Sequence, residues 1–299
     1  MTISMQAWTA AMRGERYADA WAIEDRAAAA RDPASADDPA LPYHRRWVWD
    51  GRSLAGADVL VRCYHGLGDT IQFARYLPAL AARARSVTLE VQPRLASLLA
   101  HLPVDRIVPF DVRHPTQWDG VAIEITELPR ALRLAPDAAP PPYLASAPAI
   151  VPAGTIGVCH LAGDWDLDRS IPAELFRPLC TQYPALMLAP GATDLPCLNP
   201  EGCPFDLEAT AALVAAVDLV VTVDTMIAHL AGAMGRPTWL LLKHEPDWRW
   251  SPSRQDTPWY PSLRLYAQPT PGDWPAVLVA VAADLATLAP RRSSAAWPA

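Results

Sequence analysis

The stretch that decides the fold is Cys63-Tyr-His-Gly-Leu-Gly-Asp-Thr-Ile-Gln-Phe-Ala-Arg-Tyr-Leu-Pro78. An apolar run, residues 59–61, precedes it, and a turn bracketed by Gly66 and Gly68 follows. Asp69 then stands where a helical pattern begins. Glycines let a backbone approach a ligand closely and take up positive φ, and the start of a helix adds N–H groups that bind anions. The order strand, glycine turn and helix predicts a binding site at the carboxyl edge of a parallel sheet, as in doubly wound α/β domains.

Length and composition indicate a globular chain with two domains. The chain has 299 residues, of which 51% are hydrophobic and 19% are charged, and this is enough for two cores of ordinary size. The formal net charge is −7 and no lysine- or arginine-rich run occurs, so a nucleic-acid-binding surface is not expected. Mild acidity is compatible with an anionic ligand, because local arginines and helix N-termini decide such binding.

The cysteines and the hydropathy pattern give expectations about the compartment. Five cysteines, an odd number without the spacing of metal ligands, are expected to be free thiols. No charged segment followed by an apolar leader opens the sequence, and no apolar run reaches the roughly 20 residues that span a bilayer. We therefore expect a cytoplasmic protein without a transmembrane segment. Peripheral association with a membrane and the oligomeric state stay open.

Alternating patterns predict the elements of two parallel sheets. Residues 3–31 predict two short helices with a break at Gly14-Glu-Arg16. In the first half, the expected strands are 57–63, 87–91, 107–110 and 121–125, and the expected helices are about 69–84 and 93–101. In the second half, the expected strands are 155–160, 185–189, 219–223 and 238–242, and the expected helices are 172–182, 207–216, 225–235 and about 273–289.

A proline-rich stretch, residues 134–152, separates the two halves, because such a sequence continues neither a helix nor a central strand. We therefore predict an α/β fold with two Rossmann-like domains that face each other across a cleft. The expected parts are a helical hairpin with its linker at 1–40, a first Rossmann-like domain at 41–150, a second at 151–290 and a tail at 291–299.

Three blocks of sequence carry a resemblance to a known family. The blocks are His65 to Pro78, Asp218-Leu-Val-Val-Thr-Val-Asp-Thr-Met-Ile-Ala-His-Leu-Ala-Gly-Ala-Met-Gly-Arg-Pro-Thr-Trp-Leu-Leu-Leu242, and Pro246-Asp-Trp-Arg-Trp250 continuing to Ser262. Together they resemble heptosyltransferase-like glycosyltransferases (family nine and its relatives), especially the branch often fused to tetratricopeptide repeats. The resemblance implies the GT-B fold, with an acceptor on the first domain and a nucleotide-sugar donor on the second. It also makes residues 14–26 similar to a last tetratricopeptide unit, although an ordinary helical hairpin predicts nearly the same structure.

Asp69 has two interpretations. In the family that the first block resembles, the matching acid is regarded as the general base, and a sugar hydroxyl needs such a base to become a nucleophile. Without the resemblance, helix capping explains an aspartate here better. The resemblance favours catalysis, and it places Gly66 and Gly68 beside the donor phosphates. His65 and Gln72 are then candidate contacts for the acceptor, although His65 is equally explained as part of the turn.

The second block places polar side chains at the start of a helix. The apolar run 219–223 ends at Asp224, and Thr225 and Met226 open the helix. Backbone N–H groups and the Thr225 hydroxyl suit a diphosphate, and His229 lies one turn further on the same face. A lone histidine on such a helix is more often structural, but the resemblance to the family's donor-binding signature favours a donor contact for all four side chains.

The loop after the first strand of the second domain departs from the family pattern. Arg169 and Ser170 match the pair that the related branch places near the donor phosphates, and arginine binds phosphate through paired hydrogen bonds. Three aspartates stand just before this pair, so donor identity stays open, and a solvated loop is an equal alternative. Lys243 and Glu245, just beyond a strand, are within reach of a nucleotide. Five residues nearby could stack on a sugar or base, although most of the aromatic ones are expected to pack in the core and loops: Trp248, Arg249, Trp250, Trp259 and Tyr260.

The expected function is inverting transfer of a sugar from a nucleotide-diphosphate donor to an acceptor hydroxyl. The GT-B resemblance implies that no metal ion and no further cofactor take part. The acceptor stays open among a glycan, a lipid-linked glycan and a protein. Two other functions also stay open: a GT-B sugar-nucleotide epimerase or hydrolase, which needs no acceptor, and a non-catalytic scaffold derived from such an enzyme.

Overall fold

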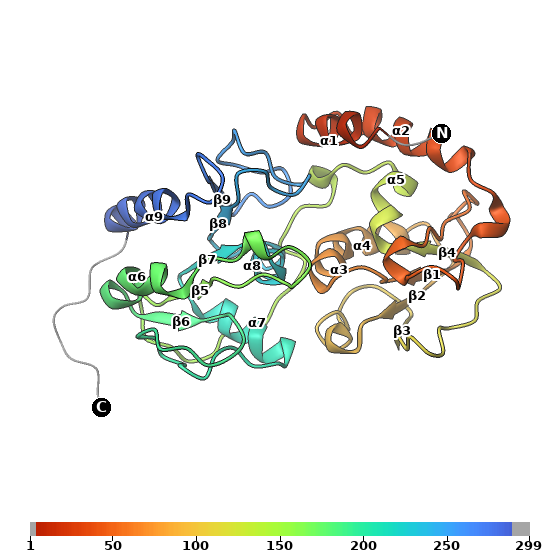
Figure 1. The fold of residues 1–299 in the computed structure, drawn as a ribbon. Helices are drawn as coiled ribbons and strands as arrows, with labels where there is room; N and C mark the ends of the chain where they lie inside the picture. Colours follow the sequence, from red (N-terminus) through yellow and green to blue (C-terminus); the bar gives the residue numbers. More distant parts are fainter. Residues whose placement is uncertain (1–3, 289–299) are drawn as a thin grey trace. The chain divides into compact units, whose positions relative to one another are not determined.

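The computed structural model describes residues 4–288, which divide into two compact units at residues 140 and 141 (Figure 1). This division falls inside the proline-rich stretch 134–152. Each unit contains its own parallel sheet, so the predicted α/β class with two Rossmann-like sheets is confirmed. The predicted tail at 291–299 and the last predicted residue of the final helix, 289, lie outside the described residues. Among residues 4–288, every helix is too short or too polar to cross a bilayer.

Two helices, α1 (Met5–Arg13) and α2 (Tyr17–Ala29), open the first unit as a hairpin. The indole N–H of Trp8 donates to a carboxylate oxygen of Glu24 at 2.6 Å, which joins the two helices. Glu24 also lies 3.5 Å from the guanidinium of Arg130, so an ion pair fastens the hairpin to the rest of the unit.

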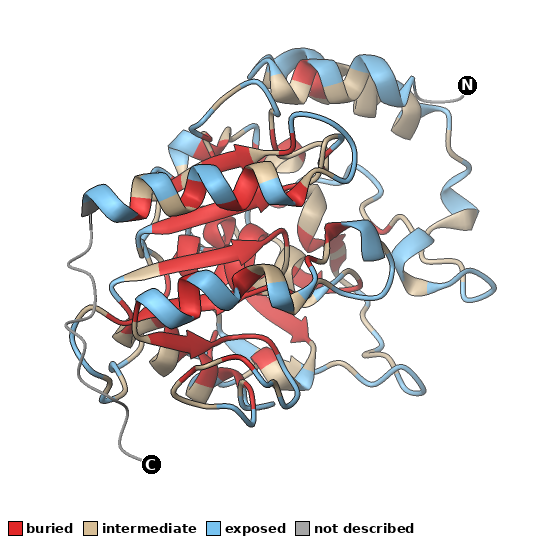
Figure 2. Cartoon of the chain, turned by 60° about the vertical axis from the view of Figure 1, so that its left-hand side comes forward, coloured by how far each residue is buried: buried red, intermediate tan, exposed pale blue. Residues whose placement is uncertain are grey.

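The first unit is built on a four-stranded sheet in which all neighbouring strands are parallel, in the order β3-β2-β1-β4. Its strands are β1 (Asp58–Arg62), β2 (Ser86–Val91), β3 (Arg106–Pro109) and β4 (Val121–Glu124). Residues 59–61 of β1 are fully buried, and Figure 2 shows the strands of the structure mostly in the buried colour. Strands covered on both faces appear in a sequence as apolar runs, which is why β1, β2 and β4 were predictable, whereas β3 is partly exposed.

The predicted helix 69–84 is interrupted. It consists of α3 (Leu67–Phe73), a 3₁₀ turn (Ala74–Tyr76) and α4 (Leu77–Ala81). Pro78 lacks an N–H group, and only the first turn of a helix tolerates that loss. A new helix therefore begins just before the proline.

Two other segments of the first unit differ from prediction. The predicted helix 93–101 forms only a 3₁₀ turn, Pro93–Leu95, followed by irregular turns. An unpredicted helix, α5 (Leu128–Leu132), follows β4 and ends at Arg133, whose φ is 55°. Helices of about one turn leave too few residues for a periodic pattern.

The second unit contains a five-stranded parallel sheet in the order β6-β5-β7-β8-β9. Its strands are β5 (Ile156–Cys159), β6 (Ala185–Met187), β7 (Leu219–Val223), β8 (Thr238–Leu242) and β9 (Leu263–Ala267). Its helices are α6 (Arg177–Gln182), α7 (Leu207–Ala216), α8 (Met226–Ala233) and α9 (Trp274–Leu288). Helix α7 packs against α8, and α9 packs beside the 3₁₀ turn that precedes α6. This pairing is the one expected when helices cover both faces of a doubly wound sheet.

Strand β9 is absent from the predicted elements. Arg264 interrupts its apolar sequence and is only half-buried, between the buried residues Leu263 and Leu265. An edge strand with one partly solvated side has this alternation. The predicted helix 172–182 differs as well, because its first turn is the 3₁₀ turn Ala173–Phe176.

Strand order places a switch point in each sheet. In the first sheet, β1 lies between β2 and β4, and in the second, β5 lies between β6 and β7. The loops that leave neighbouring strands diverge at such points and open a crevice at the carboxyl edge of the sheet. Four segments leave the strands at these switch points: 63–69 after β1, 124–127 after β4, 160–170 after β5 and 224–229 after β7.

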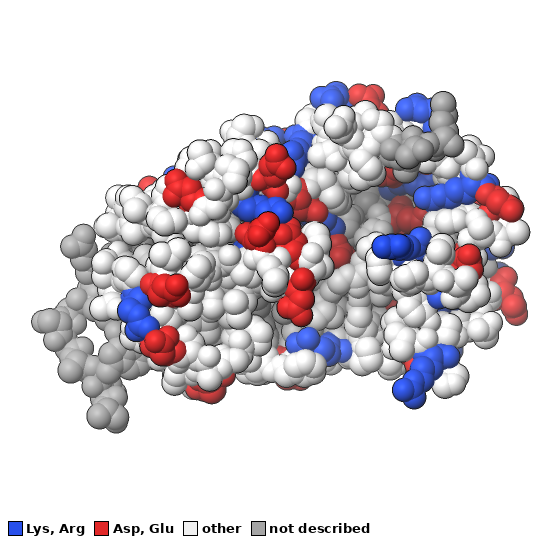
Figure 3. All heavy atoms as spheres, in the orientation of Figure 1, with Lys and Arg blue, Asp and Glu red and all other residues white. Residues whose placement is uncertain are grey.

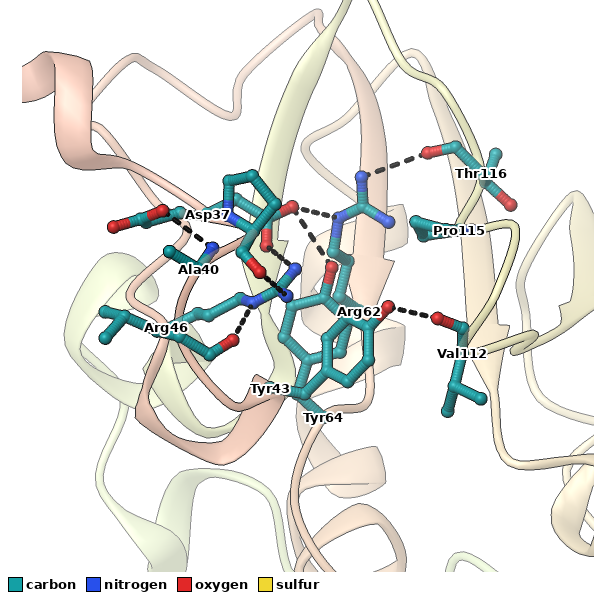
Figure 4. Close-up of polar contacts among 12 residues, drawn as sticks. Asp37, Ala40, Tyr43, Arg46, Arg62, Tyr64, Val112, Pro115 and Thr116 are labelled. Atoms are coloured by element: carbon teal, nitrogen blue, oxygen red, sulfur yellow. Dashed lines mark hydrogen bonds and ion pairs between the residues drawn. The ribbon is translucent and has the colours of Figure 1, made fainter.

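A segment that we call the strap, residues 33–47, is fastened to the carboxyl end of β1 through Asp37 (Figure 4). The carboxylate of Asp37 lies 3.3 Å from the guanidinium nitrogens of both Arg46 and Arg62, and it accepts a hydrogen bond from the Tyr64 hydroxyl at 3.1 Å. Asp37 itself has a left-handed φ of 48°. Three donors on one carboxylate thus hold the strap beside the start of the glycine turn.

Arg62 also takes part in a buried ion pair with Glu90 on the neighbouring strand. The two side chains are 7% and 1% exposed, and Glu90 accepts the backbone N–H of Thr116 at 2.6 Å while Arg62 donates to the Thr116 carbonyl at 3.0 Å. Every charge in this network therefore has a partner. Removing Arg62 leaves the Glu90 charge buried without an ion-pair partner, and removing Glu90 leaves Arg62 with the more distant Asp37 carboxylate alone.

We predict that Arg62→Met or Glu90→Leu alone lowers the free energy of unfolding by about 3–5 kcal/mol, the usual cost of leaving one buried charge unpaired. The double variant should recover much of this loss, because a well-packed apolar pair replaces both charges. Urea denaturation of the three variants measures the effect.

The matched control is the exposed ion pair between Arg85 and Asp58 at the opposite end of the same strands. Arg85→Met should change the free energy of unfolding far less than either buried substitution does, because surface ion pairs contribute little to stability. If the double variant loses as much free energy of unfolding as the two single variants lose together, the proposed compensation is contradicted.

Candidate functional site

The glycine turn after β1 holds Asp69 in a defined position. The backbone N–H of Gly66 donates to Asp69 Oδ2 at 3.0 Å. Gly66 has a φ of −68°, and Gly68 is not among the glycines with positive φ, so the expected left-handed conformation is wrong for both. What Gly66 provides is room, because a Cβ atom at this position would lie only 3.2 Å from Asp69 Oδ2.

Asp69 is the third residue of α3, which begins at Leu67, and is not the residue before the helix. Its carboxylate reaches back to the Gly66 N–H, which is the contact that acids at the third helical position typically make. Helix capping is therefore one role of Asp69. Its role as a general base stays a prediction.

Glu124, at the end of β4, holds the segment before the glycine turn. Its Oε1 accepts the Tyr64 N–H at 3.2 Å and lies 3.0 Å from His65 Nδ1. Gln92 donates to the His65 carbonyl at 2.7 Å and accepts from the Thr70 hydroxyl at 3.0 Å. These contacts fix the turn from two neighbouring strands.

The two predicted acceptor contacts have different surroundings. The side chain of His65 is 33% exposed, so a ligand can reach it. Gln72 is fully buried. Its amide is therefore not presented to an acceptor in this structure, and its predicted role lacks support.

The second switch point leads to the start of α8. Asp224 ends the turn after β7, Thr225 has extended backbone angles (φ −152°, ψ 177°), and the helix begins at Met226. Thr225 makes no side-chain capping hydrogen bond to the helix. Thr225 and Met226 are both half-buried. The first N–H groups of α8 thus lack a side-chain cap, which leaves them suited to an anionic ligand.

His229 is packed in an aromatic group. It is 6% exposed, and its Nδ1 lies 3.1 Å from the Tyr260 hydroxyl. The Trp250 and Tyr260 ring centroids lie 5.8 Å and 5.9 Å from the imidazole. A Cβ atom on Gly232 would lie 2.5 Å from the Tyr260 ring, so this glycine admits the tyrosine. The expected core position of Trp250 and Tyr260 is confirmed, and they give His229 a structural role that the sequence did not reveal.

Arg169 joins the two loops at the second switch point. It lies at the end of a 3₁₀ turn, Leu167–Arg169, and is 7% exposed. Its Nη1 donates to the Asp224 carbonyl at 2.8 Å. Ser170 Oγ accepts the Ala162 N–H at 3.0 Å, so this side chain braces the loop.

Six charged side chains lie around this point, three of each sign. Lys243, just after β8, lies 2.7 Å from Asp166, and Arg249 lies 2.8 Å from Asp247. Burial, followed by the nearby Asp247 carboxylate, raises the pKa of Asp224 to about 6, although Arg169 and Arg249 oppose the shift. Asp247 and Arg249 were not among the predicted site residues, although they stand in the third block of sequence.

Three aspartates, Asp164, Asp166 and Asp168, alternate along the loop after β5. An Asp-x-Asp spacing is compatible with metal binding in a sequence. In the structure, however, Asp166 pairs with Lys243. Within the described part of the chain, no group of three or more His, Cys, Asp or Glu side chains is arranged to hold a metal ion.

The surface agrees with this local balance of charge. On the face shown in Figure 3, basic and acidic side chains of the described residues are interspersed, and neither sign forms an extended area. Anion binding at the second switch point therefore depends on local groups, namely Arg169, Lys243 and the start of α8.

Comparisons with known proteins agree with this architecture. Residues 203–258 match the sequence profile of Glycosyltransferase family 9 (heptosyltransferase). Protein FlbA of Caulobacter vibrioides is 26% identical over 288 residues, which cover 79% of this chain and 48% of that protein. The chain thus spans about half the length of this curated relative.

Two solved Escherichia coli structures share the fold. Heptosyltransferase WaaC with ADP has a TM-score of 0.53 at 14% identity, covering 77% of this chain and 99% of that one. ADP-heptose lps heptosyltransferase II has a TM-score of 0.50 at 16% identity, with the same coverage. The resemblance to glycosyltransferase family 9 is therefore confirmed, by the match over residues 203–258 and by a two-sheet GT-B fold shared with heptosyltransferases.

Proposed function

We propose that the chain is a glycosyltransferase that moves a sugar from a nucleoside-diphosphate donor to a hydroxyl group of an acceptor. The observation that carries this proposal is the β5–β7 switch point, where the buried guanidinium of Arg169 lies beside the uncapped start of α8. A helix N-terminus and an arginine both suit phosphate oxygens, because each presents several N–H donors. The match to family 9, over residues 203–258, includes β7 and the start of α8.

In this proposal the donor diphosphate accepts hydrogen bonds from the first N–H groups of α8 and from the Thr225 hydroxyl. Arg169 supplies the neighbouring positive charge. His229 supports the helix from behind through Tyr260 and Trp250. Since heptosyltransferase WaaC was solved with ADP, ADP is the first nucleotide to test, beside UDP and GDP.

The acceptor is activated from the first unit. As the acceptor oxygen bonds to the anomeric carbon, its proton passes to the Asp69 carboxylate, and the bond between that carbon and the phosphate oxygen breaks. The nucleoside diphosphate leaves with the electron pair. A single displacement of this kind inverts the anomeric configuration. Arg169 and the first N–H groups of α8 stabilise the charge of the leaving group, and the proposal includes no metal ion.

Asp69 gives the sharpest test of the chemical step. We predict that Asp69→Asn lowers kcat by about 10²–10⁴-fold, the range for loss of a general base. The affinity for ADP should stay within about twofold, because an amide oxygen still accepts the Gly66 N–H. Turnover and calorimetric titration measure the two effects.

The control variant is Asp105→Asn, which alters an acid that accepts the Val87 N–H at the opposite edge of the same sheet. It should leave kcat unchanged. Wild-type turnover in Asp69→Asn would remove the assignment of the base.

Thr225 and His229 should behave differently. We predict that Thr225→Ala weakens ADP binding by about 1–2 kcal/mol, the scale of a hydrogen bond to a charged group, with little change in Tm. His229→Ala should instead lower the free energy of unfolding by about 2–4 kcal/mol, because it removes a packed ring and its hydrogen bond with Tyr260. Titration and melting of both variants decide the matter, and normal ADP binding by Thr225→Ala would place the diphosphate elsewhere.

Asp224 is expected to cost stability at neutral pH. Its pKa rises from 3.8 in the unfolded chain to about 6 in the folded protein, so the folded state binds the proton more tightly. The stabilisation that protonation gives is fully present below about pH 4 and is lost as the pH rises through 6. A buried carboxylate whose ionisation lowers the stability of the fold is typical of a functional site.

We predict that Asp224→Asn is more stable than the wild type at pH 8 by on the order of 3 kcal/mol, since one pKa unit corresponds to about 1.4 kcal/mol. The difference should vanish near pH 4, because asparagine resembles the protonated acid. Chemical denaturation at several pH values measures it, with Asp194→Asn, at a position 84% exposed, as the control. Equal stability of Asp224→Asn and wild type at pH 8 would contradict the prediction.

A further inference from the structure

The Asp166 carboxylate lies beside two cations of the proposed donor site, Lys243 and Arg169. Its Oδ2 lies 2.7 Å from Lys243 Nζ and 3.9 Å from Arg169 Nε. The two cations come from different strands, because Arg169 follows β5 and Lys243 follows β8. The carboxylate thus bridges the two cations, as an oxygen of a bound diphosphate would.

The three side chains are largely withdrawn from water. Their exposed fractions are 16% for Asp166, 26% for Lys243 and 9% for Arg169. Charges in such surroundings interact more strongly than they do at an open surface. A carboxylate and a diphosphate cannot both hold these cations at full strength.

Arg169 has contacts besides the Asp166 carboxylate, and its Nε also donates to the Asp166 backbone carbonyl at 3.4 Å. Its Nη1 donates to the Asp224 carbonyl at 2.8 Å, and the Trp165 ring centroid lies 4.3 Å from its guanidinium carbon. If the Asp166 carboxylate leaves, Arg169 therefore stays at the switch point. Lys243 would then be available to a new anion.

The segment that carries Asp166 is weakly packed. Its neighbours Trp165 and Leu167 are 74% and 67% exposed, although both are large apolar residues. Few buried contacts oppose a local change of the backbone in such a segment. A shift of the backbone at Asp166 therefore displaces few packed apolar side chains, and the energy of the Asp166–Lys243 ion pair has to be replaced by the incoming anion.

The charges around the site also favour exchange. Asp166, Asp224 and Asp247 stand against Arg169, Lys243 and Arg249, so the six groups balance before any ligand arrives. A diphosphate adds negative charge to a balanced site. Release of one carboxylate from the cations offsets part of that addition.

We propose that Asp166 is an internal counter-ion, which holds Lys243 and faces Arg169 while the site is empty and which the donor diphosphate displaces. This inference rests on the proposed function. The inference extends the proposed function by assigning Lys243 to diphosphate binding and by making Asp166 a competitor of the donor. The apparent affinity is then reduced by the fraction of molecules in which Asp166 occupies the site.

The test uses ADP and inorganic pyrophosphate as probes, with wild type, Asp166→Asn, Lys243→Met and the double variant. Asp168→Asn is the matched control, because it removes the same charge from an exposed position two residues away. Binding constants come from calorimetry at fixed ionic strength. Hydrogen exchange of residues 161–170 with and without ADP reports on the movement of the loop.

Asp166→Asn should bind both probes about three- to tenfold more tightly than Asp168→Asn does, the scale of a partly buried ion pair. Lys243→Met should weaken binding by a similar factor, and Asp166→Asn should give no gain in the double variant. Exchange in 161–170 should change when ADP binds to the wild type.

If Asp166→Asn binds the probes no more tightly than Asp168→Asn does, the counter-ion proposal is overturned. Asp166 would then orient the cations for the donor and not compete with it. Unchanged exchange in the loop at saturating ADP also overturns it. If no protein binds either probe, the donor site itself fails and this inference fails with it. These outcomes separate failure of the counter-ion from failure of the proposed function.

Discussion

The hydrogen bond from Arg169 to the Asp224 carbonyl is the interaction on which the second unit's site depends. It joins the loop after β5 to the end of β7, where the strand order makes neighbouring loops diverge. The guanidinium is buried, so its charge acts at close range on the start of α8. The positive charge of Arg169 also opposes the rise in the pKa of Asp224.

The two units use opposite chemistry at the same place in the fold. In the first, buried carboxylates hold the loops, since Glu124 accepts the Tyr64 N–H and Glu90 accepts the Thr116 N–H. In the second, a buried guanidinium does so by donating to a carbonyl. A first unit with acids at its carboxyl edge suits proton removal from an acceptor. The buried guanidinium of the second unit is compatible with the anionic donor that we propose for it.

Most strands could be predicted because buried parallel strands appear as apolar runs, whereas β9 was missed because Arg264 interrupts its pattern. Helices failed where proline or short length removed the periodicity, as between residues 69 and 84. The glycine turn and Thr225 were proposed as site residues because each lies close after a strand, and Arg169 was proposed because it matches the pattern of the related family. The contact partners of the site residues were not predicted, because they lie far apart in the sequence. His229 contacts Tyr260, 31 residues away, and Lys243 contacts Asp166, 77 residues away. Pairings at such separations depend on tertiary packing, which a single sequence does not display.

The central claim is that a nucleoside diphosphate binds at the switch point between β5 and β7. A crystal structure of the protein with ADP tests it most directly. The account predicts phosphate oxygens within hydrogen-bonding distance of the Met226 N–H and the Thr225 hydroxyl, beside the Arg169 guanidinium. A diphosphate bound at another surface, with the start of α8 unliganded, would contradict it.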